Sequence, residues 1–288
     1  MCDGPEYAAQ EPRAVRPVKA THGYTKQGAG YGSSGVKGLN ALIATLSTPT
    51  SAPLIAATRL RKGSANSARG ADRLIADALA TTKQCCVTGL VIVRADSAYF
   101  NHDVVAAARR GGAKVSITAR MNPAVLRAIA GIKESARTPI HYPNAIWDEQ
   151  EQRLVSDAQV AEIPFTAFTS RTKAEHVDGR LIVRRVKRLN RASVPSNQGE
   201  LFATYRHHAI FTDTTLEMLQ AETTHRGHAI IEQVHADLRA GPLAHLPSSS
   251  FSANGAWLVL AAIAFNLTRA AGAIASVFSR QGHHRHHP

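Results

Sequence analysis

The sequence predicts an α/β protein in which a mixed sheet is flanked by helices. Short apolar runs rich in β-branched residues, such as residues 91–93, have the length and composition of buried strands. Other segments, such as residues 71–79, repeat apolar residues at helical spacing. The two kinds of segment alternate along the first half of the chain, and 288 residues are enough to bury a sizeable core.

The first half of the chain is expected to hold two strands joined by a loop that contains Pro49, followed by alternating helices and strands. Ser67 is a candidate cap for the first of these helices. The expected elements are strands over 39–46 and 54–60, a helix from 68 to between 82 and 85, a strand ending at Asp96, a helix over 101–110, a strand over 114–119 and a short helix over 123–132.

Residues 138–213 have a different character and predict a β-rich insertion, with strands over 163–169, 180–188 and 205–212. The middle strand is strongly basic, and we predict that one of its faces contacts phosphates. The alternative is an edge strand whose charges face solvent and prevent further pairing. The cations of this strand are Arg180, Arg184, Arg185, Lys187 and Arg188.

The last third of the chain is expected to be helical. A long helix is predicted over 221–240, ended by Gly241 and Pro242, and a final helix over 253–277. The final helix is apolar on most sides, which predicts burial, and its stretch 257–265 is too short to span a bilayer. No membrane association is expected. On the wheel of the long helix, Ile230, Ile231, Val234 and Leu238 oppose His225, His228, Glu232, His235 and Arg239.

The charge balance is the unusual feature of the composition. Thirty-four Lys and Arg residues against 21 Asp and Glu residues leave a net charge of +13 and a pI near 10.2. Such an excess favours a polyanionic partner, nucleic acid first, although a basic protein can also lack any specific polyanion. The three cysteines include the adjacent pair Cys85 and Cys86, which predicts neither a disulfide framework nor a zinc ribbon. A reducing cytoplasm fits this pattern, and no signal peptide is expected.

A glycine-rich basic segment spans residues 23–38 and includes Lys26. Its spacing does not match a nucleotide-binding P-loop. Its Tyr, Lys and Gly residues could contact a DNA backbone, and a flexible hairpin loop is an equally good interpretation.

Two isolated acids are the candidate catalytic residues. Asp96 ends a predicted buried strand, where open α/β sheets place their chemistry, and Glu232 lies on a later helix among bases and cations. If the fold brings them together, their oxygen ligands suit Mg²⁺ or Mn²⁺ for phosphodiester cleavage. The alternatives are that Asp96 only caps a helix and Glu232 only forms a surface ion pair. A zinc site formed by His228, Glu232 and His235 is a further alternative.

Three segments together resemble the DDE-type transposases of bacterial insertion sequences. They are Arg94-Ala95-Asp96-Ser97-Ala98-Tyr99-Phe100, the glycine-rich segment through Asn40, and His225-Arg226 with Ile231-Glu232-Gln233 and Asp237-Leu238-Arg239. The resemblance covers the chain from about Val18 onward. It implies a ribonuclease H-like fold, DNA transposition, and a two-metal site of Mg²⁺ or Mn²⁺ in which Asp96 is the second metal-binding carboxylate and Glu232 the third. Arg239 stands where the family has a Lys that contacts the transposon end.

The first carboxylate of the family's triad has no counterpart. The family has this Asp on a strand just upstream of the segment aligned with residues 18–28, where this sequence reads Arg13-Ala14-Val15-Arg16-Pro17. No Asp or Glu occurs between Glu11 and Asp72. We therefore expect a truncated copy without the family's N-terminal DNA-binding portion, which binds metal weakly. The alternative is a catalytically dead DNA-binding relic that inhibits an intact transposase.

The expected partners are DNA at transposon ends and either a second copy of the chain or an intact transposase. The candidate DNA contacts are Lys26, Arg184, Arg185, Lys187, Arg188, Arg226 and Arg239. The expected divisions of the chain are a loose lead-in over 1–17, a first part of the core over 18–137, the insertion over 138–213, a helical completion of the core over 214–281 and a disordered tail over 282–288.

Overall fold

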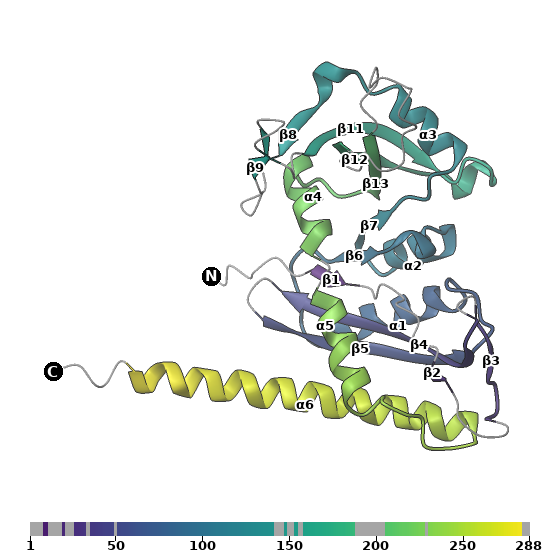
Figure 1. Ribbon diagram of the computed structural model, residues 1–288, viewed down its shortest axis with the longest axis vertical. Coiled ribbons are helices and arrows are strands. Elements are labelled where there is room, and N and C mark those ends of the chain that lie inside the picture. The colour runs from purple at the N-terminus through teal and green to yellow at the C-terminus, as the bar shows by residue number, and fades with distance from the viewer. Residues whose placement is uncertain are drawn as a thin grey trace. The chain divides into compact units, whose positions relative to one another are not determined.

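A computed structural model describes residues 8–10, 19–20, 26–32, 35–48, 51–140, 147–148, 153–154, 158–187, 205–227 and 230–283. The chain forms two compact units. Unit 1 combines residues 1–115 with 227–288, and unit 2 consists of residues 116–226. Both units contain sheet and helix, so the predicted α/β class is confirmed (Figure 1).

The sheet of unit 1 is built around the long strand β4 (Lys37–Thr48). Four of the described strands pair with it in antiparallel register: β1 (Ala8–Gln10), β2 (Lys19–Ala20), β3 (Gly30–Tyr31) and β5 (Ser51–Lys62). The strand β1 (Ala8–Gln10) lies between β4 and β6 (Ile92–Ala95), antiparallel to the first and parallel to the second. This mixed order is the ribonuclease H-like arrangement that the resemblance implies.

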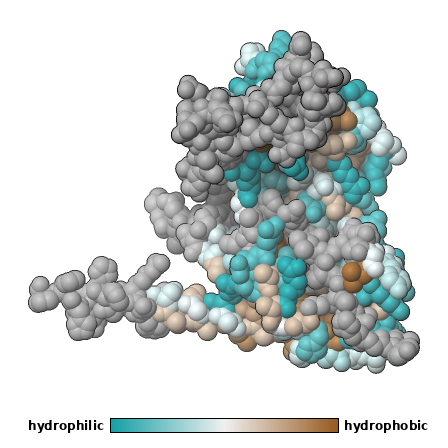
Figure 2. Space-filling view, in the orientation of Figure 1, coloured by the Kyte–Doolittle hydropathy of each residue, from teal (hydrophilic) through white to brown (hydrophobic). Residues whose placement is uncertain are grey.

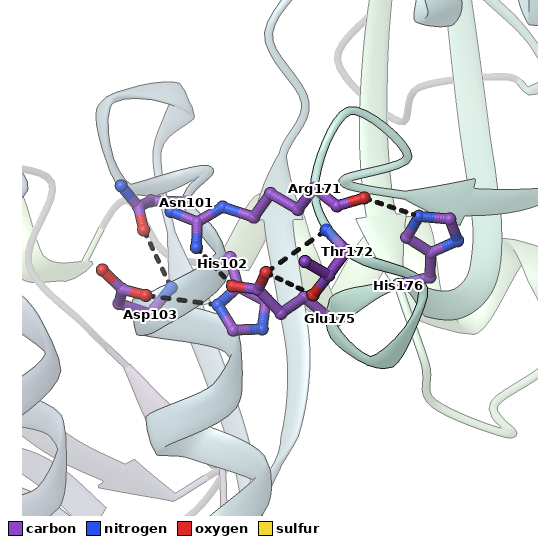
Figure 3. A network of polar contacts seen from close by, with 7 residues as sticks. All are labelled: Asn101, His102, Asp103, Arg171, Thr172, Glu175 and His176. Atoms are coloured by element: carbon purple, nitrogen blue, oxygen red, sulfur yellow. Dashed lines mark hydrogen bonds and ion pairs between the residues drawn. The ribbon is translucent and has the colours of Figure 1, made fainter.

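Local sequence explains the helices that follow β6. The side chain of Asn101 accepts a hydrogen bond from the N–H of Asp103 (2.8 Å) and caps α2 (His102–Arg110), as Figure 3 shows. The helix α1 (Ala71–Gln84) begins differently from the prediction: Gly70 occupies the N-cap position with φ +76°, and no side chain caps it. Ser67 is therefore not the cap, because the chain reaches the helix through a left-handed turn that glycine adopts without strain.

The core of unit 1 lies where two C-terminal helices cover β4 and β5. It combines Ile43 and Ile55 of the strands with Val234 and Leu238 of α5 (Ile230–Ala240). The helix α6 (Phe251–His283) contributes Leu258, Ala261, Ala262 and Phe265.

The predicted helix over 221–240 is two helices. The first, α4 (Met218–Arg226), belongs to unit 2, and the second, α5, belongs to unit 1. Gly227 follows α4, and a Cβ at this position would meet the guanidinium of Arg94 at 3.4 Å. Glycine is a weak helix former, so its position after α4 fits a break between the two helices.

The prediction that the final helix is buried on most sides is wrong. Its C-terminal half extends beyond the strands of unit 1 (Figure 1), and the rest of the helix is covered where it packs against β5 and α5. Large apolar side chains on the other face are 48–65% exposed, and this helix is largely pale to tan in Figure 2. These residues are Val259, Leu260, Ile263, Leu267 and Ile274.

Among the described residues, one stretch, Phe251–Ser276, is long and apolar enough to cross a membrane by length and composition. Its mean hydropathy is 1.7, and 11% of the window tested is buried. The predicted stretch of nine residues therefore lies within a longer apolar helix. A single helix of this kind is weak evidence for a membrane span, because the core helices of soluble proteins meet the same criterion.

Unit 2 contains the predicted insertion strands. Its sheet has the order β7, β13, β12, β11, β8, with every pair antiparallel. The bounds are β7 (Lys114–Thr118, of which residues 116–118 pair with β13), β8 (Thr138–Ile140), β11 (Ala158–Ala167), β12 (Val177–Lys187) and β13 (Tyr205–Thr212). Because β12 is paired on both sides, the alternative of an edge strand for the basic segment is wrong.

The remaining elements of unit 2 are short. Two helices, α3 (Pro123–Ala130) and α4, accompany the sheet, and Ala221 of α4 packs with Val160, Ile182 and Ile210 of the strands. Two-residue strands, β9 (Trp147–Asp148) and β10 (Arg153–Leu154), pair with each other. Short 3₁₀ turns occupy Glu134–Ala136 and Lys173–Glu175.

The 3₁₀ turn at Lys173–Glu175 is fixed by an exposed polar network (Figure 3). Glu175 accepts hydrogen bonds from the hydroxyl of Thr172 (2.7 Å) and from the guanidinium of Arg171 (2.6 Å). These two donors, the hydroxyl first, lower the pKa of Glu175 to about 2. The turn therefore keeps its carboxylate ionised in all but strong acid.

Candidate active site

Asp96 lies directly after the buried strand β6, as predicted, and its backbone is extended (φ −80°, ψ 177°). Its carboxylate accepts a hydrogen bond from the N–H of Ala98 (2.7 Å), and its carbonyl accepts one from the N–H of Tyr99 (3.1 Å). Asp96 therefore caps the 3₁₀ turn Ser97–Tyr99 in addition to ending the strand, whereas Asn101 caps the following helix. This turn holds the carboxylate at the carboxyl end of β6.

A buried cation precedes Asp96 on the same strand. The side chain of Arg94 is 5% exposed, and burial lowers its pKa to about 10. Successive side chains of an extended chain point to opposite sides, so Arg94 and Asp96, which are two residues apart, point to the same side of the sheet. The carboxyl end of β6 thus has a positive charge within its packed interior.

Glu232 lies in the first turn of α5, and its side chain is exposed. The opposite side of this helix is buried as the wheel predicted, with Ile231, Val234 and Leu238 at most 2% exposed. The prediction that His225 and His235 accompany Glu232 on a polar face is wrong. His235 is 3% exposed, and His225 lies on α4 in unit 2, where its ring contacts the hydroxyls of Ser116 (3.0 Å) and Thr118 (3.1 Å).

The strand beside β6 carries no carboxylate. The three residues of β1 are Ala8, Ala9 and Gln10, and Gln10 pairs with Arg94 in the parallel register. Within the ranges that the structure describes, no group of three or more His, Cys, Asp or Glu side chains could hold a metal ion. His228 of the alternative zinc site lies outside these ranges.

Lys26 and Arg239 make contacts within unit 1. The ammonium of Lys26 donates to the carbonyl of Leu246, which ties the glycine-rich segment to the chain before α6. Arg239 donates from Nε to the carbonyl of His235 (3.2 Å) and lines an apolar cavity with Leu238 and Leu246. Both cations remain at least partly accessible.

Most of the predicted DNA-contacting cations of unit 2 are paired with carboxylates. Nε of Arg226 lies 2.7 Å from Glu222, a side chain with no exposed surface, and Nε of Arg184 lies 3.7 Å from the same carboxylate. Arg180 pairs with Glu162 (2.6 Å). These contacts give each of the three arginines a structural role.

Arg185 has the most complete set of partners. Its guanidinium donates to both oxygens of Glu134 and to Gln159 (2.6 Å), and it stacks over the ring of Tyr205 (4.2 Å). The hydrogen bonds from Arg185 are the main cause of the lowered pKa of Glu134. Arg185 is 7% exposed. The side chain of Lys187 and the whole of Arg188 lie outside the described residues.

Sequence comparisons place most of the chain in one family. The family described as "Transposase DDE domain" matches residues 15–267, which include Asp96, Glu232 and Arg239. A search of curated proteins finds no match.

Proposed function

The chain belongs to the transposase DDE domain family, and we propose that Asp96 and Glu232 are two of its metal-binding carboxylates and that the first of the triad is missing. The function class is that of a DDE-type transposase, which acts on transposon ends with divalent metal ions.

One observation carries the proposal. In the ribonuclease H-like family the strand of the first Asp lies beside and parallel to the strand of the second, and β1 has this position beside β6, upstream of the segment 13–17 that the resemblance indicated, which lies outside the described residues. Here β1 reads Ala8-Ala9-Gln10. A neutral strand at this position removes the carboxylate that both metal ions of a two-metal site share, so binding of the metal pair is weakened.

Asp96 and Glu232 fit the role of hard-metal ligands because both are carboxylates, the donors that Mg²⁺ and Mn²⁺ prefer. Bound metal would activate the attacking hydroxyl and stabilise the leaving oxygen of the phosphodiester. Asp96 is held in place by the N–H of Ala98, and Glu232 by the rigid helix α5. With two ligands, we infer binding too weak for efficient cleavage.

DNA binding does not depend on the missing carboxylate. The net charge of +13 favours the phosphate backbone, and Lys26, Lys187, Arg188 and Arg239 are the proposed contacts, because Arg184, Arg185 and Arg226 are paired with carboxylates. A protein of this kind would bind transposon ends without cutting them. We propose that it acts in the cytoplasm on the nucleoid, paired with a second copy or with an intact transposase that it inhibits.

Calorimetric titration with Mn²⁺ tests the metal site. We expect weak binding by the unmodified chain that is lost in both Asp96→Ala and Glu232→Ala. Substitution of Asp103, an exposed acid on α2, by Ala is the matched control and should leave the titration unchanged. Binding that persists in both site variants would show that the two acids do not share a metal.

A gain of affinity offers the stronger test. Gln10 is the β1 residue paired with Arg94, two residues before Asp96, so Gln10→Asp adds a carboxylate to this part of the sheet. We expect tighter Mn²⁺ binding in this variant, with Gln10→Asn as the uncharged control. Metal-dependent cleavage of a transposon end by the unmodified chain, abolished in Asp96→Ala, would contradict the proposed defect.

A further inference from the structure

A basic cavity in unit 1 lies outside the candidate metal site. Its volume is about 460 Å³, and it is formed by the end of β5, the following loop and the first turn of α1. Five of its lining residues are cations and one is an acid: Arg59, Arg61, Lys62, Arg69, Arg73 and Asp72. Cavities for uncharged small molecules are mainly apolar, so this lining points to an anion.

The five cations divide into two groups by what they contact. Arg59 is paired with Asp77 (2.9 Å), and Arg61 is buried, with 6% exposed. The side chains of Lys62, Arg69 and Arg73 are exposed, and none of the three forms an ion pair with another described residue. Their charge is therefore available to a ligand.

Arg61 shapes the cavity wall. Its guanidinium donates to the carbonyls of Asn66 (2.9 Å), Ser67 (2.8 Å) and Arg69 (2.8 Å), and to the side chain of Asn40 (2.7 Å). One buried cation thus ties three carbonyls of the loop to the strand β4. This bonding turns those carbonyls toward Arg61, which leaves the exposed side chains of the loop to line the opening.

The glycine-rich segment packs against the start of the loop that follows β5. A Cβ on Gly63 would lie 1.9 Å from the carbonyl oxygen of Gly38 and 2.3 Å from that of Gly30. The N–H of Gly63 donates to the carbonyl of Gly28 (3.0 Å). The glycines let three backbone segments meet without side chains, which fixes the start of the loop.

We propose that this cavity binds a phosphate of the DNA backbone through Lys62, Arg69 and Arg73. This inference rests on the proposed DNA binding and adds a contact site to it. Guanidinium groups bind phosphate oxygens in bidentate geometry, and the positive end of the α1 dipole, at Gly70, adds to the field. The contact reads the backbone and no base, so it positions DNA without sequence preference.

The test compares duplex DNA binding by the full chain and by the variant Lys62→Gln/Arg69→Gln/Arg73→Gln at 50–200 mM salt. Loss of this one phosphate contact reduces the slope of log K against log salt by about 0.9. Over this fourfold range the unmodified chain should lose roughly 3.5-fold more affinity than the variant. The variant Arg69→Lys/Arg73→Lys keeps the charge and should retain the slope.

A matched control separates this site from total charge. Lys133, Arg110 and Arg127 are exposed, and their three substitutions by Gln change the charge by the same amount. We expect a nearly unchanged slope in this control. An equal decrease of the salt slope in both triple variants, or no decrease in either, would overturn the proposed cavity site but not the proposed DNA binding. Absence of DNA binding by the unmodified chain would overturn both proposals.

Titration with inorganic phosphate tests whether the cavity binds free phosphate instead of the DNA backbone. If free phosphate saturates the cavity variant and the unmodified chain alike, the three cations do not form the site. If it binds only the unmodified chain and competes with DNA, the proposal is supported. Binding of free phosphate that does not compete with DNA would overturn the assignment to the DNA backbone.

Discussion

The substitution Glu222→Gln tests whether the arginines of unit 2 are held by a buried carboxylate. Glu222 has no exposed surface, and Arg226 and Arg184 approach it to 2.7 and 3.7 Å. Gln has nearly the same volume, so the variant removes charge without creating a cavity. Two guanidinium groups then face each other without a counter-charge.

The expected loss of unfolding free energy depends on how exposed the two arginine partners of Glu222 are. Removing one member of a buried ion pair costs about 3–5 kcal/mol. The side chains of Arg226 and Arg184 are 34% and 23% exposed, so both recover part of their hydration. We therefore expect the lower end of the range, about 3 kcal/mol for unfolding of unit 2.

Hydrogen exchange of amides in α4 is the appropriate assay because it reports on this helix alone. A loss of about 3 kcal/mol corresponds to exchange that is roughly 150-fold faster. Substitution of the nearby exposed Glu217 by Gln is the control, with an expected change within about 0.5 kcal/mol. A change below about 1 kcal/mol in Glu222→Gln would refute the buried pairing and free both arginines for DNA.

Three further predictions concern pH and backbone packing. Burial, followed by nearby cations, lowers the pKa of His207 and His208, so these rings take up a proton at a lower pH in the fold than in the unfolded chain. The stability of unit 2 should therefore be constant above about pH 6.5 and decrease below it, and substituting both by Gln should flatten this profile in urea titrations at pH 5–7.5. The pKa of Glu175 is about 2 in the fold and 4.5 in the unfolded chain, so its carboxylate stabilises the fold above about pH 4.5 and this contribution is lost as the pH falls to 2. The variant Glu175→Gln should therefore be less stable than the unmodified chain at pH 6 and equal to it at pH 2. Gly63→Ala should lower the free energy of unfolding by about 3 kcal/mol in chemical denaturation, because backbone atoms leave no room for a Cβ. Gly272→Ala, in open space on α6, should raise it by about 0.5–1 kcal/mol. Equal effects of the two substitutions would contradict the close packing around Gly63.

Local sequence patterns gave correct predictions for elements whose structure depends on residues close to one another in sequence. The strand before Asp96 and the helix beginning at His102 follow from a β-branched run and from the capping residue Asn101. Both signals are local, since burial of an apolar run and capping of a helix involve neighbours in sequence. The buried side of α5 followed in the same way from its wheel.

Predictions failed where the partner of an element mattered. The apolar pattern of α6 suggested burial on most sides, but one sheet covers only one face of a helix that extends beyond the strands. His235 and His225 looked like companions of Glu232, yet a break after α4 directs them to different surroundings. A helical wheel assumes one continuous helix, so it could not anticipate this.

The sequence by itself determined the α/β class, the positions of Asp96 and Glu232 on their elements and the basic charge, because these depend on residue type and local period. Only the tertiary structure decided which cations are available. Arg184, Arg185 and Arg226 find carboxylates from distant segments, whereas Lys62, Arg69 and Arg73 gather around one cavity. Ion pairing depends on distances between residues far apart in sequence, and the chain must fold before those distances exist.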